Sequence, residues 1–193
     1  MTDRYTSFSQ LAASESFESY RIERQIRGSQ VALIAPHAGK IEFGTSEICR
    51  TLAGNDLTYY LFEGRKRDDN SALHITSSNF DEPNALEVAR SAQVVVTIHG
   101  QSGSKQFINV GGLGSELGQI TISVLIHAGY SASRQPNPAL GGMDRNNICN
   151  RGKSGRGLQL EISRGLRDNL VSTKTEMNRF CTVIRAALQQ FGL

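Results

Sequence analysis

Residues 31–49 read VALIAPHAGKIEFGTSEIC, and this stretch decides which fold and site the chain is expected to form. Its apolar start is typical of a buried strand, which ends near His37, and Glu42 follows five residues later. A second apolar run, AQVVVTIHG at residues 92–100, also ends on a histidine, His99. Two strands that each present a histidine at the carboxyl end, with a carboxylate close behind one of them, can build a three-ligand zinc site. Such a site leaves one coordination position open, which is the arrangement of a hydrolase.

The individual residues of this constellation are weaker signals than the set. A single histidine at a strand end is more often a hydrogen-bonded loop residue than a metal ligand. The spacing of His37 and Glu42 also arises by chance, and the HExxH helix of many metalloproteases is absent. Glycine-containing loops, AGK and GQSGS, follow the two histidines and let the backbone bend around a bound group. Together these features favour a metal site.

Further apolar runs predict strands, and they alternate with segments that predict helices. The strands are expected at residues 30–36, 57–63, 72–77, 93–98, 119–127 and 157–163. Helices are expected from Thr45 or Ser46 through Ala53, at residues 82–91 after an Asp81 cap with Pro83 early in the helix, and at residues 172–190. The alternation predicts one α/β domain over residues 1–193, with a mixed, mostly parallel sheet flanked by helices. Ligands of such sheets bind beyond the carboxyl ends of the strands, where His37 and His99 are expected.

The composition is that of an ordinary globular protein, and 193 residues suit a single core. No stretch approaches the roughly 20 apolar residues of a membrane span, so no membrane partner is expected. The polar N-terminus lacks the apolar core of a signal peptide, which predicts synthesis in the cytoplasm. Cys49, Cys149 and Cys181 form no CxxC pair, so reduced and mostly buried thiols are expected.

Basic side chains concentrate in residues 145–167, although the formal net charge of the chain is only +3. They are Arg145, Arg151, Lys153, Arg156, Arg164 and Arg167, against Asp144 and Glu161. One interpretation is a solvated face. The other is attraction and positioning of an anionic substrate, because a guanidinium group grips a carboxylate or phosphate with two hydrogen bonds. Nucleic acid is disfavoured as a partner, because aromatic residues are not interleaved with the basic ones and no helix-turn-helix signature is present.

Glu161 lies in an apolar run, GLQLEIS. A carboxylate is costly to bury unless it is paired or near a metal, and two interpretations follow. The residue either faces outward from an edge strand, or it is a general base that takes a proton from metal-activated water and passes it to the leaving amine. In the second case an apolar setting would raise its pKa toward the working range.

Two glycine-rich motifs do not predict nucleotide binding. GKS at residues 152–154 lacks the glycine required five residues before Gly152, where Asn147 stands, and no strand precedes it. GGLGSE at residues 111–116 lacks a following lysine and is expected to be a loop that enters a short helix. No G-x-S-x-G elbow is present and no cysteine has an evident histidine partner, which disfavours serine or cysteine nucleophilic catalysis.

Four motifs, in order along residues 31–170, resemble the poly-γ-glutamate hydrolases carried by phages of bacilli and by related bacterial genomes. They are PHAGKIEFGTSEIC, LHITSSNFDEP, VVVTIHG and NNICNRGKSGRGLQLEISRGLR. That family looks like a compact relative of the zinc carboxypeptidases. The resemblance implies a carboxypeptidase-like α/β fold with one Zn²⁺ per chain. His37 and Glu42 match the first metal-ligand motif, His99 matches the second histidine, and Glu161 matches the catalytic glutamate.

The resemblance also implies substrate-binding residues. The Asn150–Arg151 pair resembles the Asn-Arg element by which carboxypeptidases hold a substrate carboxylate, and Arg156 is a second candidate for that role. His74 lies in a family motif, where it either faces the substrate or is a buried structural histidine. Asn79 stands where many relatives are expected to have a histidine, so no role is assigned to that position.

The function implied is zinc-dependent hydrolysis of the γ-glutamyl amide bonds of poly-γ-glutamate, an anionic polymer, by a monomer that is released when the host cell lyses. Two alternatives stay open. One is another zinc amidohydrolase that acts on acyl-amino acids or peptidoglycan stem peptides, which would leave the polymer intact. The other is a non-enzymatic module that binds an acidic capsule polymer, which would hold no stoichiometric zinc.

Overall fold

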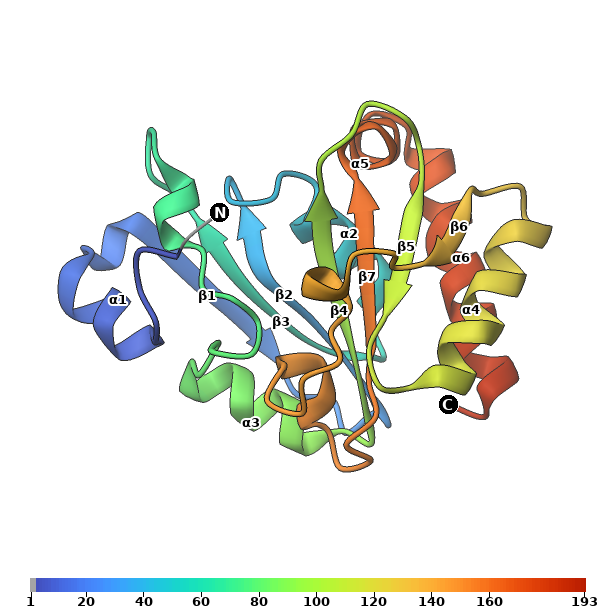
Figure 1. The fold of residues 1–193 in the computed structure, drawn as a ribbon, viewed down its shortest axis with the longest axis horizontal. Helices are drawn as coiled ribbons and strands as arrows, with labels where there is room; N and C mark the ends of the chain where they lie inside the picture. The colour runs from blue at the N-terminus through green and yellow to red at the C-terminus, as the bar shows by residue number, and fades with distance from the viewer. Residues whose placement is uncertain (1–2) are drawn as a thin grey trace.

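Helices cover both faces of a seven-stranded sheet in the computed structural model, which describes residues 3–193 (Figure 1). The strands are β1 (Tyr20–Gln25), β2 (Val31–Gly39), β3 (Thr58–Gly64), β4 (Val94–Gln101), β5 (Ile108–Gly111), β6 (Ala132–Arg134) and β7 (Leu158–Ser163). The helices are α1 (Phe8–Ser14), α2 (Thr45–Ala53), α3 (Pro83–Ser91), α4 (Ser115–His127), α5 (Arg164–Ser172) and α6 (Lys174–Phe191). Strand order is β1-β3-β2-β4-β7-β5-β6; β2, β3, β4 and β7 are parallel, whereas β1, β5 and β6 run in the opposite direction. The predicted mixed, mostly parallel α/β fold is confirmed.

The central strands are buried on both faces, which explains their nearly continuous apolar sequences. Along β2, Leu33 packs into a cluster with α2 and α6, whereas the next residue, Ile34, packs into a second cluster with α1 and α3. Along β7, Leu160 and Ile162 also face the first cluster, and the residue between them faces the other side of the sheet. That residue is Glu161.

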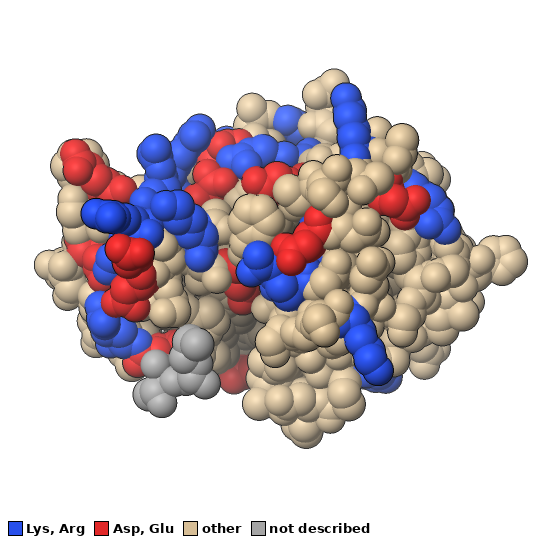
Figure 2. Space-filling view, turned by 90° about the horizontal axis from the view of Figure 1, so that it is seen from above, with Lys and Arg blue, Asp and Glu red and all other residues tan. Residues whose placement is uncertain are grey.

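The order of the strands reverses at β2, because the chain continues to β3 on one side of β2 and to β4 on the other. Ligands of doubly wound sheets bind at such a reversal, beyond the carboxyl ends of the strands. The carboxyl ends of β2, β4 and β7 all point upward in Figure 1. Figure 2 looks down on this edge and shows it hollowed near the middle, with basic and acidic side chains interspersed around the rim.

A β-bulge in β2 turns His37 toward the site. Ala35 pairs with Leu61 and Ala38 pairs with Glu63, so three steps along β2 match two steps along β3. Ala35 and Ala38 therefore both face the first cluster, although an unbroken alternation would put them on opposite faces. Proline has no N–H for the ladder, and Pro36 stands within the bulge. His37 is left on the face of the second cluster.

Residues 119–127, predicted as a strand, belong to helix α4 instead. Leu117, Thr121 and Leu125 recur every four residues and form the buried side of the helix. The β-branched composition of the segment mimics a buried strand, but packing of α4 against α6 overrides that local preference. The GGLGSE loop does lead into a helix as expected, but that helix has 13 residues and is not short.

Residues 72–77, also predicted as a strand, form part of a 3-10 turn (Asn70–Leu73) and an irregular segment. Leu73 and Ile75 are buried in the second cluster, which explains why their alternation resembles that of a strand. The backbone of this segment forms hydrogen bonds with side chains rather than with a neighbouring strand. The Ile75 carbonyl contacts His37, and the Thr76 N–H donates to Asp3.

The predicted helices exist with adjusted ends. Helix α2 ends at Ala53 as predicted, with Gly44 rather than Thr45 or Ser46 at the cap position. Helix α3 is capped by Glu82, which accepts a hydrogen bond from the Ala85 N–H at 2.8 Å, whereas Asp81 accepts from the N–H of Phe8. The C-terminal region forms two helices, because α5 ends at Ser172 and α6 begins at Lys174.

Two further expectations concern the whole chain. The three cysteines are buried and free, as predicted. Among the helices of residues 3–193, none is both long and apolar enough to cross a membrane.

Candidate metal centre and active site

Three potential metal ligands converge at the carboxyl ends of β2 and β4. His37 comes from the end of β2, Glu42 from the loop that leads to α2, and His99 from the end of β4. His37 Nδ1 lies 3.2 Å from His99 Nδ1 and 3.2 Å from Glu42 Oε1, and His99 Nδ1 lies 3.7 Å from Glu42 Oε2. They form the one group of three or more metal-ligating side chains found among the described residues.

The spacing of these atoms suits a tetrahedral metal ion. Zinc binds histidine nitrogen and carboxylate oxygen at about 2.0–2.2 Å, so two ligand atoms of a tetrahedron lie about 3.3 Å apart. The distances between His37, Glu42 and His99 are of this size without any rearrangement. Three protein ligands leave a fourth position for water or substrate, as catalytic zinc sites do.

The other ring nitrogen of each histidine is already engaged. His37 Nε2 lies 2.8 Å from the Ile75 carbonyl oxygen, to which it can only donate. His99 Nε2 lies 3.3 Å from Ser77 Oγ. A donated Nε2–H leaves Nδ1 as the unprotonated nitrogen, the form that binds a metal. Residues 75–77 therefore orient the two histidines. The sequence pattern had predicted a strand for this segment.

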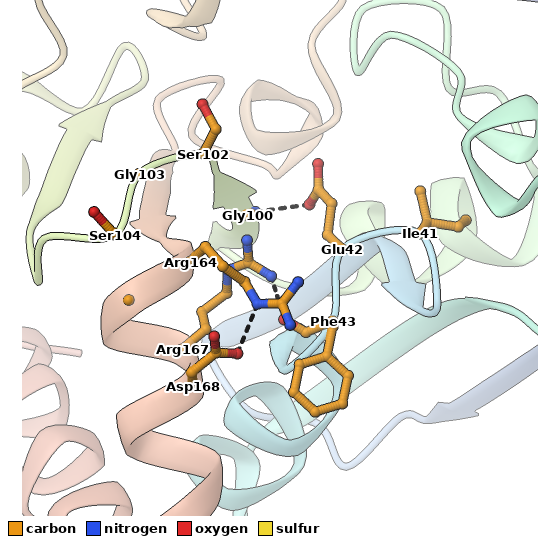
Figure 3. A pocket seen from close by; sticks show the side chains of 11 residues that line it. Ile41, Glu42, Phe43, Gly100, Ser102, Gly103, Ser104, Arg164, Arg167 and Asp168 are labelled. Atoms are coloured by element: carbon orange, nitrogen blue, oxygen red, sulfur yellow. Dashed lines mark hydrogen bonds and ion pairs between the residues drawn. The ribbon is translucent and has the colours of Figure 1, made fainter.

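The Glu42 carboxylate is held ionised. Its Oε2 accepts a hydrogen bond from the N–H of Gly100 at 2.7 Å (Figure 3). Burial by itself raises the pKa of Glu42, but the adjacent imidazole rings of His37 and His99 outweigh burial and hold that pKa well below its usual range. An ionised carboxylate is the form that a metal ligand requires.

Glu161 stands beside His99, because the two residues are register partners of β7 and β4. It is 5% exposed, and Gln159 Nε2 donates to its Oε1 at 3.0 Å. Burial raises the pKa of Glu161, and the nearby His99 only partly opposes this. The sequence left open whether Glu161 faces outward from an edge strand. It is instead a buried carboxylate of a central strand, on the same sheet face as His99.

His37, Glu42, His99 and Glu161 all line one cavity of about 880 Å³, within the range of ligand-binding pockets. Its other walls are the segment after the 3-10 turn, the loop after β4 and residues 137–147. None of its lining residues, in the part of the chain that the structure describes, is a lysine or arginine.

His74 also lines this cavity, and its ring stacks on that of His37 with 4.0 Å between centroids. Its Nδ1 lies 2.7 Å from Oδ1 of Asp3, whose Oδ2 accepts the N–H of Thr76 at 2.6 Å. The neighbouring His37, together with burial, lowers the pKa of His74 to about 4, so the His74 ring is neutral at pH 7. Sequence reasoning missed Asp3, because no local pattern connects a polar residue at the start of the chain with residue 74.

Asn150, Arg151 and Arg156 are not among the residues that line the cavity. The Asn150 amide donates to the carbonyl oxygens of Gly142 and Asp144, both at 2.8 Å, so the residue organises loops. The segment that follows reaches the start of β4, where the Ser154 N–H donates to the Gln93 carbonyl. Residues that precede a parallel strand lie at its amino end, opposite the ligand-binding edge. The cavity lining therefore gives no support to the substrate-binding role predicted for these three residues.

The comparisons with known proteins agree on one family. The sequence profile of the family described as poly-gamma-glutamate hydrolase matches residues 5–191. The UPF0714 protein YmaC of Bacillus subtilis (strain 168) is 41% identical over 168 residues, which are 86% of this chain and 71% of YmaC. The UPF0714 protein YndL of the same strain is 39% identical over 170 residues, which are 87% of this chain and 67% of YndL.

Two solved structures share the whole architecture. YndL in a zinc-free apo form superposes with a TM-score of 0.94, at 35% identity and over 100% of both chains. A bacteriophage poly-gamma-glutamate hydrolase superposes with a TM-score of 0.91, at 30% identity and over 98% of both chains. Since the family profile spans nearly the full length and the fold agrees throughout, the chain belongs to the poly-γ-glutamate hydrolase family.

Proposed function

We propose that this protein is a zinc-dependent hydrolase that cleaves the γ-glutamyl amide bonds of poly-γ-glutamate, with His37, Glu42 and His99 as metal ligands and Glu161 as general base. One observation carries the proposal: three ligand atoms lie 3.2–3.7 Å apart, and a buried carboxylate stands on the neighbouring strand in the same cavity. The family supports the polymer as substrate. The zinc-free form of YndL supports the choice of metal.

A zinc ion held by this triad would supply Lewis-acid chemistry: it polarises the amide carbonyl and lowers the pKa of water toward about 7. Glu161 then takes the proton of the attacking water. Gln159 donates to Oε1, so Oε2 is the oxygen that carries the proton. Glu161 finally passes this proton to the leaving amine, which departs as a neutral group.

His74 positions the substrate amide in this scheme. Its Nδ1–H donates to Asp3, so Nε2 of the neutral ring is a hydrogen-bond acceptor. The ring lines the cavity beside His37, and Nε2 has no partner among the described residues. An acceptor at this place suits the N–H of the scissile amide.

Metal removal and reconstitution test the proposal. The purified protein is dialysed against a chelator, then reloaded with Zn²⁺ or Mg²⁺, and the chain length of poly-γ-glutamate is followed by size-exclusion chromatography while bound metal is measured by mass spectrometry. We expect rapid shortening with zinc only. His37→Ala should bind no stoichiometric zinc. His127→Ala, which removes an exposed histidine at the end of α4, is the matched control and should behave as wild type.

Other outcomes identify the alternatives. A zinc-loaded protein that leaves the polymer intact but releases amines from acyl-amino acids or stem peptides is a different amidohydrolase. A protein that binds the polymer without cutting it, equally well with and without zinc, is a binding module. Shortening of the polymer by the zinc-free protein would contradict the metal-dependent mechanism.

A further inference from the structure

A second cavity, of about 550 Å³, adjoins the candidate metal centre, and Glu161 is not among its lining residues. Its walls are the loop after β2, the loop after β4 and the first turn of α5 (Figure 3). Ile41, Glu42, Gly100 and Ser102 line both cavities, so the two spaces meet at the metal ligand Glu42. A chain-like substrate bound at the metal can therefore extend from one cavity into the other.

Arg167 lines the second cavity as a buried cation with no carboxylate partner. Arg167 is 5% exposed, and its guanidinium donates to the carbonyl oxygens of Ile162, Phe43 and Gln101. No carboxylate of the described residues lies within ion-pair distance of it. A guanidinium has five N–H groups, so two remain available. Because burying an unpaired charge is costly, this arrangement indicates that an anion completes the site.

Arg164 brings a second guanidinium to the same cavity. Its Nε donates to Asp168 at 2.6 Å, and its Cζ lies 5.2 Å from the centroid of the Phe43 ring. This fixes the side chain while the two terminal nitrogens face no partner among the described residues. Asp168 balances one of the two arginine charges, and Glu42 is occupied as a metal ligand. One positive charge is left for a bound anion.

Gly100 makes this geometry possible. A Cβ atom at this position would lie 2.6 Å from Cζ of Arg167, so only glycine lets the guanidinium pack against the end of β4. The N–H of the same residue holds Glu42. One backbone position thus connects the metal ligand with the arginine of the second cavity.

The two cavities differ in charge, and together they suit an anionic polymer. The catalytic cavity has no lysine or arginine among its described lining residues, although the proposed polymer carries one carboxylate per residue. The second cavity, which shares Glu42 with the first, supplies the missing cations.

We propose that the second cavity is a carboxylate-binding subsite, in which Arg167 and Arg164 hold the free α-carboxylate of a glutamyl residue next to the bond that is cut. Ser102 and Ser104, which also line it, add hydroxyl donors. The proposal rests on the proposed function. Such a subsite would give the polymer a fixed register on the enzyme, with one carboxylate at the arginines while the neighbouring amide lies at the metal.

Substrate amidation combined with mutation tests the subsite. The substrates are γ-linked glutamyl oligomers in which the α-carboxylates are converted one at a time to carboxamides, and kcat/KM is measured for each. We expect one position at which amidation lowers kcat/KM about 10- to 100-fold, the loss of a charge-assisted hydrogen bond. In Arg164→Gln the same amidation should lower kcat/KM far less, because the mutation and the amidation each remove the same interaction. Arg90→Gln, on the exposed side of α3, is the matched control and should keep the full penalty.

Additive penalties, with the same loss on amidation in Arg164→Gln as in wild type, would overturn the subsite. Arg167→Lys keeps the charge but loses the planar fork, and it should lower kcat/KM for the acid oligomers while its melting temperature stays near that of wild type. Failure of the proposed function gives a separate result: wild type then cuts no oligomer at all. In that case the affinity of wild type and Arg164→Gln for the uncut oligomers tests the subsite. A more than 10-fold weaker binding by Arg164→Gln supports the subsite, and unchanged binding overturns it.

Discussion

Nδ1 of His74 lies 2.7 Å from Oδ1 of Asp3, although 71 residues separate the two in sequence. The second oxygen of Asp3 accepts the Thr76 N–H, so one carboxylate fixes both the ring and the backbone beside it. Burial opposes ionisation of Asp3, but the hydrogen bonds from Thr76 and His74 outweigh it and lower its pKa. Asp3 is thereby connected to the proposed active site through His74.

Asp3→Ala should lower kcat about 10-fold with little change in KM, because His74 loses the partner that sets its orientation. Steady-state kinetics on glutamyl oligomers measure this. Asp81→Ala is the matched control, since Asp81 also anchors the N-terminal segment, through the Phe8 N–H at 2.6 Å, without touching His74. An equal loss of activity in both variants would mean that Asp3 acts only by attaching the segment.

Ser77→Ala should weaken zinc binding about 10-fold, the usual effect of removing a hydrogen-bond partner of a ligating histidine. Ser77 Oγ lies 3.3 Å from His99 Nε2 and is buried. Competition with a chelating dye gives the affinity. The neighbouring Ser78→Ala, which leaves His99 untouched, should bind zinc as tightly as wild type, and an equal loss there would argue against a role for the contact between Ser77 and His99.

Away from the site, Glu23 should stabilise the fold in a pH-dependent way. Arg50 donates to it with two nitrogens, at 3.1 and 2.8 Å, and Tyr59 adds a hydrogen bond at 2.8 Å. Hydrogen bonding to Arg50 is the main reason that the pKa of Glu23 falls from 4.5 to about 2, against the effect of partial burial. A folded-state pKa below the unfolded one adds stability above pH 4.5 and loses it as the pH falls toward 2.

Glu23→Gln should therefore unfold about 1 kcal/mol more easily than wild type at pH 7, and the difference should shrink as the pH falls from 4.5 to about 2. Urea titrations at several pH values measure the free energy of unfolding. Glu18→Gln, at an exposed position, serves as the control and should show no such trend. A difference that is constant with pH would rule out the ion-paired carboxylate as its source.

Much of the metal centre was predictable from sequence, because parallel strands bring their carboxyl ends to one edge. His37 and His99 end two such strands, and Glu161 lies within a third, so topology alone places them close together. The bulge at Pro36–His37 was not predictable. It depends on how β2 pairs with β3, which a single strand's sequence does not encode.

The substrate-binding roles of Asn150, Arg151 and Arg156 stay predictions, because none of the three lines the cavity. Arg151 and Arg156 precede β7 and so lie at its amino end, whereas Arg164 and Arg167 follow it and lie at the ligand-binding edge. The sequence alone showed the basic segment but not which of its side chains lie at which end of β7, because that depends on strand direction. Strands β1, β5 and β6 were missed because they are short or largely polar, and their pairing comes from the rest of the sheet.

The most direct measurement uses Glu161→Gln, with zinc content and poly-γ-glutamate chain length determined on the same sample. The substitution keeps the shape of the side chain and leaves His37, Glu42 and His99 in place, so the protein should bind zinc as wild type does. It cannot accept the proton from water, and the polymer should keep its length, with kcat lowered by at least about 100-fold. Glu116→Gln, an exposed carboxylate at the start of α4, controls for the loss of charge. Zinc-loaded Glu161→Gln that shortens the polymer at the wild-type rate would contradict the mechanism.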